Sequence, residues 1–118
     1  MSEQRTADRY IGLLEGDRRA WIKEMIAFMR ENYPHAREEL LVGAPAYRLG
    51  GHYVCFAAGD RRFKFATSDS ETVELLEELL PRASAMGDGV MVPYSHHTYM
   101  WTLFDAIRDI AKKSGRSS

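Results

Sequence analysis

A run of strand-like residues in the middle of the chain, interrupted by short turns, constrains the fold most. Residues 53–58 are apolar and rich in β-forming side chains, and residues 62–65 alternate between charged and aromatic at a period of two. Glycine-containing turns at 50–51 and 59–60 flank these runs. Because turns this short join antiparallel neighbours, we expect a meander of about three antiparallel strands over residues 46–67.

The segments on either side of this meander show helical periodicity. Trp21, Met25 and Met29, for example, recur along one side of a helix. We expect four helices: residues 6–15, residues 17–32, the 68–70 turn to Leu80, and His97 or Thr98 to Lys113. A leading strand at 39–42 and a late strand at 90–92 complete the pattern. This order predicts an α+β fold, an antiparallel sheet of about four to six strands with helices packed on one face, including two N-terminal helices and a C-terminal helix.

Length and composition fit one ordinary globular domain over residues 1–118, with a core at about 5–113 and a polar tail at 114–118. The net charge is −1, from 16 basic and 17 acidic residues, so we expect no nucleic-acid partner held by a broad basic surface. Residues 1–9 lack the apolar stretch of a signal peptide, and no apolar run approaches the length of a membrane span. With a single cysteine, these features predict a cytoplasmic protein without a membrane partner.

Several stretches resemble a known protein family. Residues 33–38 followed by 43–47 are similar to a phrase of the YdhG-like family, also called the domain of unknown function 1801. Residues 53–58 and 89–93 are similar to two of its strands, and the likeness covers roughly residues 5–113. The residues that match the family phrase most specifically are Glu38, Gly43, Pro45 and Tyr47.

This resemblance implies a compact α+β domain of a frataxin-like two-layer kind. Some members of the family are regarded as intracellular iron chaperones, and most have no assigned activity. The chain departs from the family pattern at residues 62–67, where the histidine, tyrosine and proline of a frequent hairpin phrase are missing. A lysine that often precedes the late strand is replaced by Gly87 or Asp88.

A basic and aromatic sheet face supports our first hypothesis. Arg48, Arg62 and Lys64 could share the face of the sheet away from the helices, with Tyr47 or Tyr53 nearby. We therefore expect a non-enzymatic binding or protein-interaction module that presents this face to a partner protein or a small ligand. The alternative is the solvated side of an ordinary antiparallel sheet. Small domains of this sort also dimerise through a sheet face or edge, so a homodimer is one form of this hypothesis.

The family phrase itself allows two interpretations. Gly43 permits a backbone angle that other residues avoid, and Pro45 stiffens the approach to a strand. The phrase could therefore shape a binding surface, or it could be a turn that leads into the sheet.

An acidic helix face supports the alternative hypothesis, an intracellular iron-binding chaperone. Glu71, Glu74 and Glu78 recur at i, i+3 and i+7, and His96 could add a further ligand. The competing interpretation is a solvated acidic face near a helix N-terminus, where Ser68 and Glu71 match a capping box. No spacing typical of a structural zinc site is present.

No catalytic motif stands out in the sequence. Cys55 lies in the middle of an apolar strand, where a free cysteine is expected to be a buried and unreactive small hydrophobe. We therefore expect no enzymatic activity.

Overall fold

The expected meander is present in the computed structural model, which describes residues 6–115. The sheet has these strands within that range: β1 (Glu38–Leu41), β2 (Ala44–Leu49), β3 (His52–Ala58), β4 (Arg62–Thr67), β5 (Ser84–Met86) and β6 (Gly89–Pro93). All neighbouring strands are antiparallel, in the order β1-β2-β3-β4-β6-β5. The α+β class and the expected range of strand numbers are therefore confirmed.

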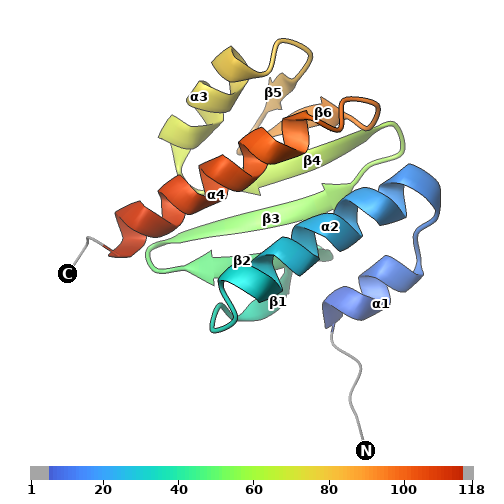
Figure 1. Ribbon diagram of the computed structural model, residues 1–118, viewed down its shortest axis with the longest axis horizontal. Coiled ribbons are helices and arrows are strands. Elements are labelled where there is room, and N and C mark those ends of the chain that lie inside the picture. The colour runs from blue at the N-terminus through green and yellow to red at the C-terminus, as the bar shows by residue number, and fades with distance from the viewer. Residues whose placement is uncertain (1–5, 116–118) are drawn as a thin grey trace, which may run out of the picture.

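The helices lie mainly in one layer. Within the described residues they are α1 (Thr6–Gly12), α2 (Gly16–Asn32), α3 (Ser70–Leu79) and α4 (Tyr99–Gly115). α2 and α4 cross the same face of the sheet, and α3 lies beside α4, while α1 packs near β1 (Figure 1). The opposite face, crossed by no helix of residues 6–115, is called the open face below. None of these helices is long and apolar enough to cross a lipid bilayer.

Large aromatic side chains fill the space between the sheet and the helices. Phe56, Phe63 and Phe65 are fully buried there because alternate residues of β3 and β4 point to this layer. Trp21 of α2 lies with its ring centroid 5.1 Å from that of Phe63, and its indole N–H donates a 3.0 Å hydrogen bond to the carbonyl oxygen of Tyr94. Burying such side chains stabilises the fold by about 1.5–3 kcal/mol each.

Two elements differ from the expectation. α1 ends at Gly12 rather than at residue 15. β5 was not predicted, because its three residues, Ser84–Met86, are all exposed and show no alternation. β5 is a strand because its backbone pairs with β6, which only the tertiary structure brings about.

The start of α3 also differs from the expectation. The N-cap residue is Asp69, so the capping box of Ser68 and Glu71 is wrong. The Asp69 carboxylate instead accepts hydrogen bonds from the Thr72 hydroxyl at 2.9 Å and from the Lys113 ammonium at 2.7 Å. Lys113 also donates to Glu71 at 2.9 Å. These contacts, which we call the helix clasp, fasten the beginning of α3 to the last turns of α4.

Candidate functional site

The open face has a floor of unusually small side chains. Directly opposed residues of antiparallel strands point to the same face, so the strand register defines rows across the sheet. One row crosses every strand: Glu39, Ala46, Cys55, Ala66, Gly89 and Met86. Its central residues are no larger than cysteine. A side chain at Gly89 would collide with the backbone of Phe65 and Ala66, so this part of the floor has to be flat.

A polar cluster stands over this floor. The Asp88 carboxylate accepts a 2.8 Å hydrogen bond from the Tyr53 hydroxyl and lies 3.4 Å from the Lys64 ammonium. Partial burial acts to raise the pKa of Asp88, but the Tyr53 hydrogen bond and the Lys64 charge outweigh it and lower that pKa below its ordinary value. The same hydrogen bond, aided by burial, raises the pKa of Tyr53. Tyr53, Lys64 and Asp88, which we call the open-face clasp, therefore hold a neutral tyrosine against an ionised carboxylate.

A hollow of about 240 Å³ lies between this clasp and the β1–β2 turn. It is lined by Leu41, Val42, Ala44, Cys55, Ala57, Lys64, Ala66 and Asp88. One wall is therefore charged and the other is apolar, and the floor consists of methyl groups and a thiol. This shape suits an apolar group with polar atoms on one side.

The β1–β2 turn, which forms the apolar wall of the hollow, has a strained backbone. Val42 has a φ of 51° and is 99% exposed, and Gly43 after it has a φ of 80°. Two consecutive positive φ angles are what a type I′ hairpin turn requires, but asparagine or glycine normally occupies its first position. A β-branched residue in this region of backbone angles is uncommon and costly. Residues held in such conformations cluster at functional sites, so the strain at Val42 makes this rim a candidate functional surface.

The thiol on the floor is protected rather than reactive. Burial, assisted by the negative charge of Asp88, raises the pKa of Cys55 to about 11. Its Sγ lies 3.9 Å from the carbonyl oxygen of Ala44 and 4.0 Å from that of Leu41. A thiol with such a pKa is almost entirely neutral at pH 7, and the thiolate is the nucleophilic form.

All three basic residues expected on the open face lie there. Arg48 pairs across the sheet with Tyr53, Arg62 donates a 3.0 Å hydrogen bond to the Ser84 hydroxyl, and Lys64 lines the hollow. Tyr47 was wrongly placed on this face. It follows the opposite alternation to Arg48, so it points to the helix layer, where it is 2% exposed.

The residues of the family phrase build the hairpin at the edge of the hollow. The Tyr47 hydroxyl donates to Glu38 at 2.9 Å, and Glu38 accepts a 2.6 Å hydrogen bond from Arg30. Gly43 lies in the turn, and Pro45 is buried opposite Leu40. These positions therefore fix the β1–β2 hairpin. In the structure they form a turn that leads into the sheet, which is one of the two interpretations of the family phrase.

The residues considered for a metal do not converge. Glu71 forms an ion pair with Lys113 at 2.9 Å, and the ring of His96 lies 5.0 Å from that of Tyr99. Glu74 and Glu78 are exposed on α3. Within residues 6–115, no group of three or more histidine, cysteine or acidic side chains is placed to hold a metal ion.

Fold and face together define a two-layer α+β domain with an open antiparallel sheet. The structure is similar to the crystal structure of YdhG, a protein of the DUF1801 family from Bacillus subtilis, with a TM-score of 0.70 and 15% sequence identity. The likeness covers 96% of this chain and 94% of that one. The fold is therefore the YdhG-like fold, in agreement with the resemblance seen in the sequence. No family model and no curated protein matches the sequence.

Proposed function

We propose that this chain is a non-enzymatic protein-interaction module whose open face receives an apolar side chain of a partner. The observation that carries this proposal is the hollow of about 240 Å³ with its small-residue floor, bordered by the exposed and strained Val42. Protein interfaces gain most of their affinity from a few anchors that fill such hollows.

The charges around the hollow indicate what surrounds the anchor. Arg48 and Arg62 are exposed on the same face, and Lys64 forms part of the wall. Acidic residues beside the anchor would complement them and speed association. The partner is therefore a polypeptide with a leucine-sized or aromatic anchor flanked by acidic residues. A second copy of this chain that supplies the anchor would make the module a homodimer.

The raised pKa of Cys55 supports a non-enzymatic role. The nearest candidate for a base in the sequence, His52, has its Nδ1 3.1 Å from the Ser68 hydroxyl. A cysteine nucleophile needs a lowered pKa and an adjacent base, and Cys55 has the opposite shift. The thiol therefore contributes shape and polarisability to the floor rather than chemistry.

A cavity-filling substitution tests this proposal. In Ala57→Phe the new ring would occupy the hollow, because Ala57 lines it and is only partly buried. The matched control is Ala85→Phe on the exposed strand β5, which does not line the hollow. Peptides selected from a random displayed library against the unmodified protein should carry an apolar anchor with acidic neighbours, and Ala57→Phe should weaken their binding by about tenfold or more.

Two results would contradict the proposal. One is a set of selected peptides whose affinities are the same for Ala57→Phe as for the unmodified protein and Ala85→Phe. The other is a selection that yields no binder at all. Sedimentation equilibrium of the same proteins tests the homodimer form, since a dimer that uses the hollow dissociates in Ala57→Phe and persists in Ala85→Phe.

The iron-chaperone alternative has weaker support, because Glu71 is already paired with Lys113 and the acidic side chains of α3 are not gathered around one point. It predicts saturable Fe²⁺ binding under anaerobic calorimetry, with preference over Mg²⁺ and Zn²⁺. Under this alternative, replacing Glu71, Glu74 and Glu78 together with glutamine should abolish that binding.

A further inference from the structure

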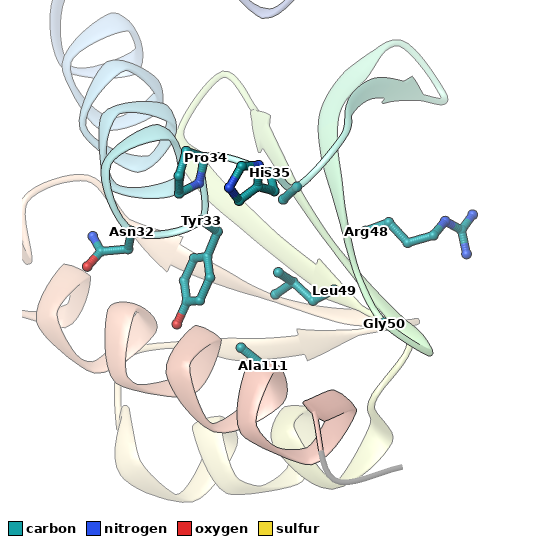
Figure 2. Close-up of a pocket in the computed structure, with 9 residues that line it drawn as sticks. Asn32, Tyr33, Pro34, His35, Arg48, Leu49, Gly50 and Ala111 are labelled. Atoms are coloured by element: carbon teal, nitrogen blue, oxygen red, sulfur yellow. The ribbon is translucent and has the colours of Figure 1, made fainter. Parts of the chain in front are cut away.

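A second and larger hollow lies away from the open face, at the end of the molecule where α2 and α4 terminate beside the β2–β3 turn (Figure 2). Its volume is about 470 Å³, within the range of about 300–1,000 Å³ that small-molecule sites usually have. Residues 33–36, part of the stretch that resembles the family phrase, form one side of it. The interaction proposed above does not use the interior of this hollow, although Arg48 borders both surfaces.

The interior of this hollow is apolar and aromatic. Leu49 points into it from β2, and the Tyr33 ring and Ala111 lie on the side of α4 (Figure 2). Pro34 forms part of the opposite side. The Tyr33 ring also makes an edge contact with Phe28, with centroids 6.2 Å apart, so its position is supported from the core. An apolar or aromatic group of a ligand therefore has a fixed ring and aliphatic surfaces to pack against.

The rim of the hollow is basic. Among the described residues that line it, none is acidic, and the ionisable ones besides Tyr33 are His35 and Arg48, both exposed. Within the described chain, the Arg48 guanidinium forms no ion pair, whereas Arg30 and Arg108 do. In Figure 2 the Arg48 side chain extends away from the hollow, as strand alternation with the inward-pointing Leu49 requires. A contact with a head group at the rim therefore requires Arg48 to adopt a different rotamer.

We propose that this hollow binds a small amphipathic carboxylate, with its apolar body between Tyr33, Pro34 and Leu49 and its carboxylate on His35 and Arg48. Guanidinium and carboxylate form the strongest class of side-chain hydrogen bond, often with two parallel contacts. The apolar interior and the absence of an acid among the lining residues together select against cations and against small hydrophilic anions.

A third hollow, which also has charged walls, lacks these features. It lies between α3 and α4, has a volume of about 380 Å³ and is lined by Glu71, Asp109 and Lys113, among others. Lys113 is already held by Asp69 and Glu71 in the helix clasp. An anion there would have to displace existing ion pairs, which makes the hollow beside Tyr33 the better site.

A series of ligands that share one apolar body tests the proposal on the intact protein. The probes are 3-phenylpropionate, its neutral amide and 3-phenylpropylamine, titrated by calorimetry and followed by backbone-amide NMR. The carboxylate should bind roughly tenfold more tightly than the amide, and the amine more weakly still. The largest NMR shifts should fall on Ala36, Leu49 and Gly50, which line the hollow.

Variants separate the body of the ligand from its head group. Ala111→Phe fills the hollow and should abolish binding of every probe, while Ala27→Phe on the exposed side of α2 is the matched control. Arg48→Gln, an exposed position that cannot disturb the core, should weaken the carboxylate roughly tenfold and leave the amide unchanged.

Several outcomes would overturn the proposal. They are equal affinities for the carboxylate and the amine, no binding of any probe, retained binding in a folded Ala111→Phe protein, or NMR shifts centred on Cys55 and Lys64 instead. If Ala111→Phe fails to fold, the His35→Gln and Arg48→Gln pair decides, since unchanged carboxylate affinity in both contradicts the assigned head-group contacts.

Discussion

The two faces of the sheet are made by alternate residues of the same strands, yet near the centre of the sheet their side chains differ sharply in size. In β3, Val54 and Phe56 point to the helix layer, whereas Cys55 and Ala57 point to the open face. Large side chains on one face are fully buried by the protein's own helices. Small ones on the other form a floor with a hollow over it. The difference indicates that the helix face contributes most of the large buried core, while the open face is the surface to which we assign the proposed partner.

The largest expected effect is on the helix side. Phe63→Ala removes a fully buried ring that contacts Trp21 and Phe56, and it should lower the free energy of unfolding by about 3–5 kcal/mol. Cys55→Ala on the open face removes a single sulfur atom and should cost under about 1.5 kcal/mol. Urea denaturation measures the free energy of unfolding of both variants. Equal losses would contradict the conclusion that the helix face contributes more to stability than the open face.

The flat floor at Gly89 gives the next largest effect. Gly89→Ala places a methyl group against the carbonyl oxygen of Phe65, so strands β4 and β6 have to separate. We expect a loss of about 1–3 kcal/mol. Gly51→Ala is the control, since a methyl group there meets no atom within 4 Å. If Gly89→Ala leaves the free energy of unfolding unchanged, the floor accommodates a side chain at this position and need not be flat.

The two clasps should respond differently to pH. Asp69 of the helix clasp has a side chain only 6% exposed. Burial acts to raise its pKa, but the hydrogen bonds from Lys113 and Thr72 outweigh it, so the pKa lies below its ordinary value. A carboxylate with a lowered folded-state pKa stabilises the fold above the unfolded-state pKa of about 3.9, and that contribution is lost as the pH falls through the lowered value.

Asp69→Asn should therefore cost about 2 kcal/mol at pH 7 and flatten the decline of stability below pH 4. Asp88→Asn in the open-face clasp, where the carboxylate is 47% exposed, should cost under about 1 kcal/mol. Thermal unfolding at a series of pH values compares the two variants. An equal or larger loss of stability in Asp88→Asn would show that the open-face clasp stabilises the fold as much as the helix clasp does.

The smallest expected effect has the opposite sign. Val42→Asn relieves a left-handed backbone at a β-branched residue and should stabilise the protein by about 1 kcal/mol. It should also weaken binding of the selected peptides, because the apolar rim is lost. Val42→Thr keeps the β-branch, and hence the strain, but removes apolar surface. It should therefore weaken binding without stabilising the fold, and stabilisation by Val42→Thr would show that strain is not the cause.

The sequence predicted the layers of this fold better than its surfaces. The alternation of Phe63 and Phe65 and the glycine turns identified the meander, because both signals are local. Tyr47 was predicted on the wrong face because the strand Ala44–Leu49 has no clear pattern of large and small residues. Strand alternation by itself would have placed Tyr47 and Arg48 on opposite faces. The open-face clasp joins Tyr53 to Asp88, 35 positions apart, and no local pattern predicts which strands will become neighbours.

The hollow beside Tyr33 was missed for a similar reason. Its lining comes from the end of α2 with residues 33–36, from the end of β2 with the β2–β3 turn, and from α4, and these three parts lie far apart in the sequence. The residues of the family phrase were a usable signal, because they lead directly into this region and into the hairpin of the open face. What they indicated was a position in the chain, and the two separate hollows near that position arise only from the packing of the elements.

The single sulfhydryl on the open face has a practical consequence. Because Cys55 is the sole cysteine of the chain, every event of thiol labelling reports on one known point. With a pKa of about 11, its alkylation rate should rise roughly tenfold per pH unit through the neutral range. Any molecule that seats itself over the sheet would shield this atom and slow that rate. The protein thus carries its own footprinting probe, which reports occupancy of the open face without a tag or a dye.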